Sequence, residues 1–264
     1  NDCNTNKRAM TLNLNTPEGI EIVTAARHNR KLKTGALGGN CFTIILRECL
    51  GEPSGVRARI EQMRIQGVPN YFGEQRFGRD GANLVHARAM FAGTEASRDR
   101  HRRGLYLSAA RSFLFNEVLA ARVRDGSWQS ILPGEACILA GSRSFFVTDT
   151  VDDVIARRLA EHDIHPSGPL WGRGQPPSRA AVHELEITIA GQHADLAQGL
   201  SAAGLEQERR ALRLIPRELT AELLDASTWQ LHFCLPAGCY ATAVVQELAD
   251  YTIHDPMLLE DETP

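Results

Sequence analysis

The alternation of apolar and polar residues near the carboxyl end of the chain constrains the fold most directly. Apolar side chains stand at every second position of the segment 229–235, which reads WQLHFCL. Successive side chains of a strand point to opposite faces of a sheet, so this pattern predicts a strand with one buried face. A second strand is predicted at 41–46, where the run CFTIIL is apolar and rich in β-branched residues.

Three other segments, 56–66, 106–124 and 240–251, space their apolar residues as helices do, at intervals of three and four positions. Helices and strands are therefore mixed without the strict βαβ rhythm of a parallel sheet, and the predicted fold class is α+β. The segment 165–179 (HPSGPLWGRGQPPSR) is rich in glycine and proline and predicts a loop or an internal linker.

Basic and acidic residues are divided unevenly along the 264 residues. Residues 1–130 carry 20 Lys and Arg against 12 Asp and Glu, a balance of +8, whereas residues 131–264 carry 9 against 20, a balance of −11. All but three of the basic residues are Arg, whose planar guanidinium group pairs with phosphate and stacks on bases. The asymmetry fits a polyanionic partner on one side of the molecule, and it also fits an ordinary solvated surface with a compositional bias toward Arg.

The composition is that of an ordinary globular protein, with 43% hydrophobic and 23% charged residues. Every apolar run is shorter than the roughly 18–20 residues of a membrane helix, and the first thirty residues show no signal-peptide pattern. We therefore expect a soluble, cytoplasmic protein without a membrane partner.

The six cysteines include no Cys-x-x-Cys pair. We expect reduced thiols, with Cys41 and Cys234 as small core residues inside their apolar runs. The pairs Cys234/Cys239 and His162/His165 have no partners at the spacing of a zinc finger, so the sequence predicts no metal site.

Two segments carry the side-chain types that bind phosphates and bases. The densest basic stretch is 27–33 (RHNRKLK), and glycines and Asn40 follow it directly before the predicted strand 41–46. Glycines let a backbone approach a ligand closely, and upstream cations bind phosphates. The segment 67–78 (GVPNYFGEQRFG) interleaves aromatic residues and glycines with Arg76, a composition suited to stacking bases. A solvated basic loop and a structural loop with core-facing aromatics are the alternative interpretations.

Four segments together resemble the TruD family of tRNA pseudouridine synthases. They are RHNRKLKTGALGGNCF at 27–42, VPNYFGEQRFG at 68–78, LSAARSFLFN at 107–116 and LPAGCYATAVVQEL at 235–248. The segments occur in the order found in the family, and the resemblance extends over about 27–251.

The resemblance implies a particular α+β architecture. A pseudouridine synthase catalytic domain with a mixed or antiparallel sheet would be interrupted by an inserted α+β domain specific to this family, the TRUD domain. We expect residues 1–66 to form the first part of the catalytic domain, incomplete at its N-terminus. Residues 67–216 would form the insertion, and residues 217–264 would return to the catalytic domain.

The resemblance also implies an activity and a site. The family converts the uridine at tRNA position 13 to pseudouridine by flipping the base out of the RNA and attacking it with an aspartate, without cofactor or metal. By this resemblance, Asn40 matches an asparagine beside the catalytic aspartate. Phe42 and Tyr240 match positions that contact the base, and at the position of Tyr240 the family usually has Phe. A core role remains the alternative for both aromatics.

The residues expected to hold the RNA backbone are Arg27, Arg30, Lys31, Lys33 and Arg76. We expect a bacterial, monomeric enzyme with tRNA as its partner.

The chain departs from the family at the nucleophile. The family loop reads roughly G-L-K-D-[KR]-x-A-x-T-x-Q, whereas residues 5–11 read TNKRAMT and place Asn6 at the position of the catalytic aspartate. A neutral amide does not perform the covalent chemistry of a carboxylate. The segment 1–5 also resembles a family segment that stands well upstream, which fits the hypothesis that the chain joins pieces of a longer protein. A catalytically silent RNA-binding protein on the same scaffold is therefore the second interpretation. An unrelated α+β protein whose basic loop binds another anion is the third.

Overall fold

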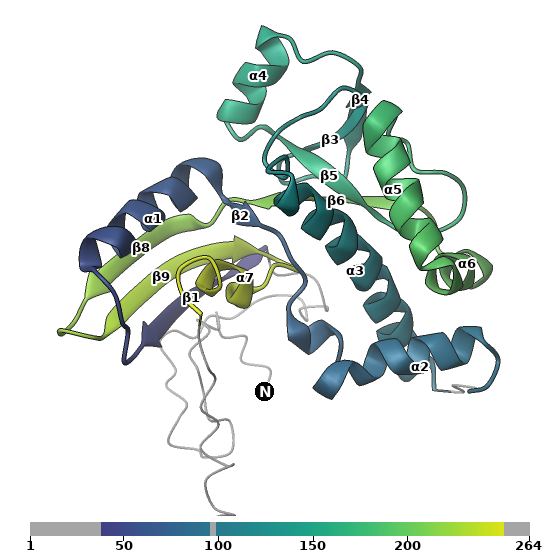
Figure 1. Ribbon diagram of the computed structural model, residues 1–264, viewed down its shortest axis with the longest axis horizontal. Helices are drawn as coiled ribbons and strands as arrows, with labels where there is room; N and C mark the ends of the chain where they lie inside the picture. Colours follow the sequence, from purple (N-terminus) through teal and green to yellow (C-terminus); the bar gives the residue numbers. More distant parts are fainter. Residues whose placement is uncertain (1–37, 96–98, 251–264) are drawn as a thin grey trace, which may run out of the picture.

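The structure of the chain is a computed structural model, and it describes residues 38–95 and 99–250. The helices and strands form two groups, each built on an antiparallel sheet, and a short two-stranded ribbon joins them (Figure 1). The fold is α+β, as predicted. Within the described ranges, no helix is both long enough and apolar enough to cross a membrane.

The first group is a three-stranded sheet in the order β1-β9-β8, with α1 packed against it. Its elements are β1 (Gly39–Leu46), α1 (Pro53–Gln66), β8 (Arg217–Leu223), β9 (Trp229–Pro236) and α7 (Ala241–Val245). Leu231 and Phe233 of β9 are buried against Ile60 and Met63 of α1, and each such burial stabilises the fold by about 1.5–3 kcal/mol. Both predicted strands and the predicted helix 56–66 are confirmed.

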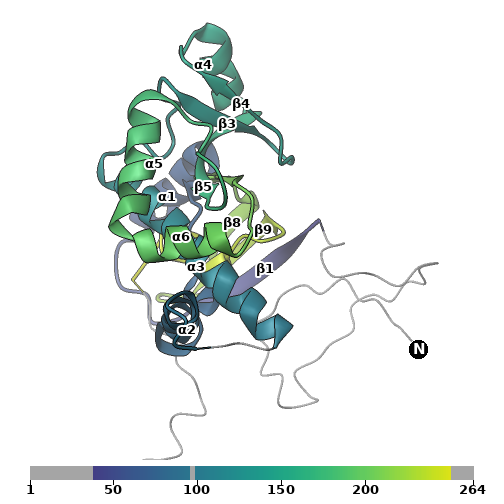
Figure 2. The same ribbon diagram turned by 90° about the vertical axis from the view of Figure 1, so that its right-hand side faces the viewer.

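The second group is a four-stranded sheet in the order β4-β3-β5-β6 with helices packed around it (Figure 2). Its strands are β3 (Glu135–Leu139), β4 (Phe145–Thr148), β5 (Ile164–Leu170) and β6 (Glu208–Ala211). Its helical elements are η2 (Glu74–Arg76), η3 (Arg79–Gly81), α2 (Ala82–Phe91), α3 (Arg100–Arg124), α4 (Asp153–Ala160), α5 (Ala180–Gln192) and α6 (Ala194–Ala202). The predicted helix at 106–124 is confirmed. It begins earlier, because Asp99 caps it by accepting a hydrogen bond from the His101 N–H at 2.8 Å.

A ribbon of β2 (Val68–Pro69) and β7 (Arg213–Leu214) connects the two groups. The chain enters it from α1 through Gly67, whose φ of 77° is accessible mainly to glycine. A Cβ atom at this position would lie 2.5 Å from the Leu214 carbonyl oxygen. The glycine therefore permits both the end of the helix and the close approach of the two strands.

Two sequence predictions on local structure are wrong in part. The first half of the segment predicted as a loop at 165–179 lies within β5, an inner strand of the second sheet. Pro166 lacks an N–H, but its carbonyl oxygen still accepts a hydrogen bond from the Leu212 N–H at 2.8 Å, and Gly168 lets the Phe115 ring approach the strand closely. The helix predicted at 240–251 is shorter, because α7 covers only Ala241–Val245.

The prediction of reduced thiols at Cys41 and Cys234 is wrong for this structure, in which a disulfide joins them. The register of β1 against β9 places the two cysteines directly opposite each other, with a Cα–Cα distance of 3.9 Å. A separation of 193 residues hides this pairing in the sequence. Cys49, Cys137 and Cys239 are free thiols.

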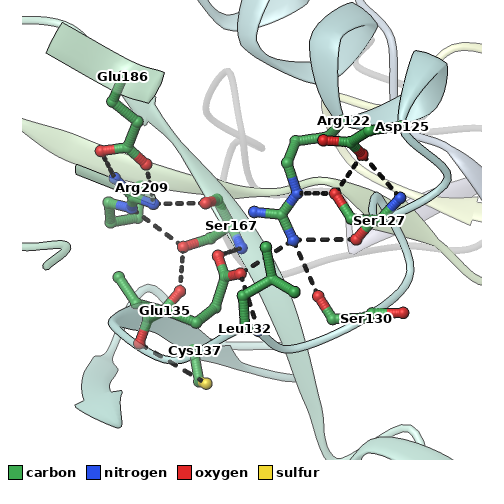
Figure 3. Close-up of polar contacts among 11 residues, drawn as sticks. Arg122, Asp125, Ser127, Ser130, Leu132, Glu135, Cys137, Ser167, Glu186 and Arg209 are labelled. Atoms are coloured by element: carbon green, nitrogen blue, oxygen red, sulfur yellow. Dashed lines mark hydrogen bonds and ion pairs between the residues drawn. The ribbon is translucent and has the colours of Figure 1, made fainter. Parts of the chain in front are cut away.

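Buried ion pairs hold the second sheet to its helices (Figure 3). Arg122 of α3 contacts Glu135 at 2.9 Å, and Arg209 of β6 contacts Glu186 of α5 at 2.8 Å. Arg209 also donates to the Ser167 hydroxyl at 3.0 Å. Burial raises the pKa of the Glu135 carboxyl, and the Arg122 guanidinium opposes that shift. Removing one partner of such a pair leaves a buried charge and costs about 3–5 kcal/mol, so this network has a structural role.

The two groups follow the division expected from the sequence. The first contains elements from 39–66 and 217–245, and the second contains elements from 74–211. The assignment of residues 1–66 and 217–264 to a catalytic domain, with an inserted TRUD domain at 67–216, stays a prediction.

Candidate functional site

A side-chain amide of α3, that of Asn116, binds the backbone of the segment after β2. Asn116 accepts a hydrogen bond from the Phe72 N–H at 2.9 Å and donates one to the Phe72 carbonyl oxygen at 3.0 Å. Both backbone groups of Phe72 are thus satisfied by one residue of a 25-residue helix. The aromatic part of the segment is therefore held by a rigid element.

Arg76, at the end of η2, connects three segments that lie far apart in the sequence. Its Nε donates to the Tyr240 hydroxyl at 2.8 Å, and its Nη1 donates to the Ser108 hydroxyl of α3 at 2.8 Å. Its Nη2 has no hydrogen bond to any residue of 38–95 or 99–250. The guanidinium is thus oriented by two neutral hydroxyls, and one of its amino groups remains available to a ligand.

The Phe72 ring lies among other aromatic rings and two guanidinium groups. Its centroid is 5.5 Å from that of Phe115 and 6.0 Å from that of Tyr240, both in edge-on arrangements. The Cζ atoms of Arg210 and Arg76 lie 4.0 Å and 5.5 Å from the Phe72 centroid, within the range of cation–π attraction. The rings and cations form one cluster, which we call the Arg76 cluster: Phe72, Arg76, Ser108, Phe115, Arg210 and Tyr240.

Arg210 joins this cluster to the turn that precedes Tyr240. Its guanidinium donates to the side-chain oxygen of Asn70 at 2.7 Å and to the Gly238 carbonyl oxygen at 3.0 Å. Burial lowers the pKa of Arg210, although a guanidinium remains cationic at neutral pH. Burial also raises the pKa of the neighbouring Cys239 thiol, against the opposing effect of Arg210.

Within residues 38–95 and 99–250, the Arg76 cluster carries positive charge without a carboxylate as counter-charge. Among the described residues, neither Arg76 nor Arg210 forms an ion pair with a carboxylate. The adjacent Arg209 differs, because it lies on the other side of β6 and pairs with Glu186. Two uncompensated guanidiniums beside aromatic rings match the chemistry that binds a phosphate and stacks a base.

Asn40 and Phe42 lie on β1 and share one face of the first sheet. The Asn40 side chain is exposed. In the pairing of β1 with β9, Asn40 lies opposite Leu235, which stands five positions before Tyr240. Phe42 is half-buried, with its ring centroid 5.5 Å from that of Phe233, so it belongs at least in part to the core. Gly39 permits the strand pairing itself, because a Cβ atom there would lie 2.2 Å from the Leu235 carbonyl oxygen.

Tyr240 precedes α7 in an extended conformation and packs against the aromatic segment. A Cβ atom on Gly73 would lie 2.9 Å from the Tyr240 ring and 2.8 Å from the Thr242 hydroxyl oxygen. The structure thus brings Arg76 and Tyr240 into direct contact, and it places Asn40 on the strand next to the turn that leads to Tyr240. The predicted roles of Asn40, Phe42, Tyr240 and Arg76 toward RNA stay predictions.

The remaining predicted site residues lie outside the described residues. They are Asn6, Arg27, Arg30, Lys31 and Lys33.

Sequence reasoning missed four residues of the site, namely Ser108, Phe115, Asn116 and Arg210. Ser108, Phe115 and Asn116 stand in the recognised segment 107–116, and helical spacing places Ser108 and Phe115 on one side of α3, which was a usable signal. Arg210 carried no signal in the sequence, because it stands next to the structural Arg209.

Comparisons with known proteins agree on one family. The family model described as tRNA pseudouridine synthase D (TruD) matches residues 3–90 and 83–248. The tRNA pseudouridine synthase D of Xanthomonas euvesicatoria pv. vesicatoria is 52% identical over 248 residues, which cover 88% of this chain and 67% of that protein. The tRNA pseudouridine synthase D of Nitrosococcus oceani is 45% identical over 245 residues, which cover 92% of this chain and 68% of that protein.

A solved structure shows the same fold. A crystal structure from Methanosarcina mazei, assigned as tRNA pseudouridine synthase D, superposes with a TM-score of 0.59 at 18% identity, covering 88% of this chain and 74% of that chain. The chain spans about two thirds of the length of the curated relatives it matches. From the family match and these identities, the chain belongs to the tRNA pseudouridine synthase D (TruD) family.

Proposed function

We propose that this chain binds tRNA and that its site, with a carboxylate in the place of Asn6, converts the uridine at position 13 to pseudouridine. The observation that carries the proposal is the geometry of Arg76, which two neutral hydroxyls orient beside Phe72 and Tyr240 while its Nη2 stays unbonded within the described residues. A guanidinium held in this way binds a phosphate at little cost in side-chain entropy.

The proposed reaction exchanges one bond of the uridine for another. A carboxylate attacks the flipped nucleotide, the bond between C1′ and N1 breaks, and the base rotates. A bond between C1′ and C5 then forms as the bond to the carboxylate breaks and frees it, the C5 hydrogen leaves as a proton, and N1 takes up a proton. Substrate and product are isomers, so the balance requires no oxidant, reductant, cofactor or metal.

Each described site residue has a role in this proposal. The exposed amide of Asn40 orients the attacking carboxylate or the uracil. Tyr240 supplies a stacking face for the base, and Phe42 packs against it from the neighbouring strand. Arg76, with Arg27, Arg30, Lys31 and Lys33, holds the phosphates. The domain division at 66/67 and 216/217 belongs to the same proposal, and the two sheets support it.

The residue at the position of the nucleophile favours a second function. Asn6 has no carboxylate to attack the uridine. A chain with this residue would bind tRNA on the same scaffold without turning it over.

The experiment compares this chain with its Asn6→Asp variant, each in the full-length protein. Bacterial tRNA lacking the modification is incubated with either protein, digested to nucleosides and analysed for pseudouridine. The proposal expects pseudouridine from the Asn6→Asp protein and binding alone from the protein with Asn6. If the Asn6→Asp protein binds tRNA but forms no pseudouridine, the synthase proposal is wrong.

A salt series separates RNA binding from the binding of a small anion. Phosphate contacts release condensed counterions, so the logarithm of the tRNA affinity should fall linearly with the logarithm of the salt concentration. If the basic loop instead binds an unrelated small anion, the affinity for tRNA should be no higher than the affinity for a polyanion of random sequence.

A further inference from the structure

Three potential metal ligands converge on the first sheet, outside the Arg76 cluster. They are Glu218 of β8 and His232 and Cys234 of β9, whose donor atoms all lie within 4.8 Å of one another. The distance from His232 Nε2 to Glu218 Oε2 is 3.9 Å, and that from Cys234 Sγ to the same oxygen is 3.7 Å. These distances are close to the edge of about 3.3–3.8 Å of a tetrahedron with zinc–ligand bonds of about 2.0–2.3 Å.

An irregularity in β8 brings Glu218 to this position. Arg217 pairs with Cys234 and Thr220 pairs with His232, so that Glu218 and Leu219 together oppose the single residue Phe233. Glu218 has a φ of 54°, a left-handed conformation that is uncommon for a residue with a side chain. Such bulges redirect a side chain and are frequent at functional sites. Here the bulge places the Glu218 carboxylate beside both His232 and Cys234.

The imidazole of His232 is oriented as a metal ligand would be. Its Nδ1 is hydrogen-bonded to the Thr43 hydroxyl of β1 at 3.2 Å, and its Nε2 is the atom near Glu218. Histidine ligands in metal sites commonly use their second ring nitrogen for such a bond, which fixes the ring and its tautomer. The side chain retains 33% exposure, so an ion has access to it.

Cys41 places a fourth donor, its sulfur atom, next to Cys234. It lies opposite Cys234 across the β1–β9 pair and is joined to it by the disulfide. Alternation along β1 places Cys41 and Thr43 on the face opposite Phe42, and alternation along β9 places His232 and Cys234 on that same face. The side chains of Cys41, His232 and Cys234 therefore lie on the side of the sheet that does not pack against α1.

We propose that Cys41, Cys234, His232 and Glu218 bind a divalent ion of the zinc class when the disulfide is reduced. Thiolate and imidazole donors select zinc and its neighbours, whereas magnesium and calcium prefer oxygen ligands alone. The disulfide and the metal exclude each other, because each needs both sulfur atoms. The sequence concealed this site, since its donors come from three strands that pair only in the fold.

Reduction of the Cys41–Cys234 disulfide requires a two-electron reductant, and a small dithiol can supply the electrons. The dithiol gives two electrons and two protons to the Cys41–Cys234 disulfide, which becomes two thiols while the dithiol becomes a cyclic disulfide. The metal ion then displaces the two thiol protons to solvent and binds the two thiolates.

The test is a titration of the reduced protein with Co²⁺ alone under anaerobic conditions, with the oxidised protein in parallel. We expect one Co²⁺ per chain in the reduced protein, with thiolate-to-cobalt charge transfer and the visible bands of a tetrahedral site, and loss of this signal on addition of Zn²⁺. The oxidised protein should show none of these bands.

Variants assign the ligands. Replacement of both cysteines (Cys41→Ser with Cys234→Ser) should abolish the charge-transfer band, and His232→Gln and Glu218→Gln should weaken Co²⁺ binding by at least about tenfold. The free Cys49 and the exposed His101 supply the matched controls, and Cys49→Ser and His101→Gln should leave binding unchanged. His232→Gln retains both cysteines, and circular dichroism checks that each variant is folded. Absence of stoichiometric binding by the reduced protein, or an unchanged Co²⁺ affinity in folded His232→Gln, contradicts the site.

Discussion

The Nε atom of Arg76 donates a hydrogen bond to the hydroxyl oxygen of Tyr240 at 2.8 Å, across 164 residues of the chain. The contact joins the segment that follows β2 to the segment that precedes α7. Because Ser108 of α3 holds the same guanidinium, the orientation of Arg76 depends on three elements at once. The site is therefore built from distant segments and forms only when both sheets are in place.

The first prediction concerns the proposed contact of Arg76 with the phosphates of tRNA. Arg76→Gln should weaken tRNA binding by about 5–10-fold and reduce the slope of log affinity against log salt by about one, because one phosphate contact is lost. The control is Arg143→Gln, since Arg143 is 95% exposed and outside the site. A salt slope that is the same in Arg76→Gln and in the unaltered protein would show that Arg76 contacts no phosphate.

The second prediction separates the ring of Tyr240 from its hydroxyl. Tyr240→Phe retains the stacking face and loses one neutral hydrogen bond, so tRNA affinity should fall less than about fivefold. Tyr240→Ala also loses base stacking, worth about 1–3 kcal/mol, and affinity should fall by roughly tenfold or more. Filter-binding or fluorescence titrations measure both. Equal effects of the two variants would contradict a stacking role for the ring.

The third prediction concerns the stability of the Arg76 cluster. Arg210→Met keeps much of the side-chain volume but removes the hydrogen bonds to Asn70 and Gly238. The variant leaves partly buried acceptor oxygens without a donor, and its free energy of unfolding should therefore be lower by about 2–4 kcal/mol. Arg143→Gln, in contrast, should stay within about 0.5 kcal/mol. Urea unfolding followed by circular dichroism measures both, and a midpoint unchanged in Arg210→Met would refute the structural role of this arginine.

The fourth prediction is an acid-dependent loss of stability at His165. Its Nδ1 accepts a hydrogen bond from Arg213 Nε at 3.2 Å. Burial, with the positive charge of Arg213 and then His162, lowers the pKa of His165 from 6.5 to about 4. The folded state therefore takes up a proton less readily than the unfolded state. The stabilisation is complete above pH 6.5 and is lost as the pH falls from 6.5 toward 4, by at most about 3 kcal/mol.

His165→Asn tests this origin of the pH dependence. The Asn side-chain oxygen replaces Nδ1 as an acceptor and does not titrate. Unfolding free energies measured between pH 4 and 7 should decline less steeply in the variant than in the unaltered protein. If the unfolding free energy falls equally steeply with decreasing pH in both proteins, groups other than His165 cause the loss of stability.

Periodicity predicted the parts of the fold that have one buried and one exposed face. The alternation at 229–235 and the helical spacing at 56–66 and 106–124 each identified an element of the structure. Periodicity missed β5, because an inner strand is buried on both faces and its glycines and prolines looked like a linker. It also did not distinguish Arg209 from Arg210. These neighbours have the same chemistry but point to opposite sides of β6, one toward Glu186 and the other toward Phe72.

Pairing between distant strands was the other information that the sequence lacked. Nothing near Cys41 indicates that it faces Cys234, because strand register depends on the whole sheet. The resemblance to the TruD family predicted what periodicity did not, namely a single site formed by the segments around residues 40, 76 and 240, and the place of Asn40 in that site stays a prediction. The structure brings Arg76 and Tyr240 into contact.

The release of the C5 hydrogen of uridine tests the proposed reaction most directly. The full-length protein with Asn6→Asp is incubated with tRNA carrying tritium at C5 of its uridines, and tritium in the solvent is counted against bound tRNA. The account predicts release of one tritium per tRNA, arising from position 13, and no release by the protein with Asn6. Saturating tRNA binding by the Asn6→Asp protein without release of tritium would contradict it.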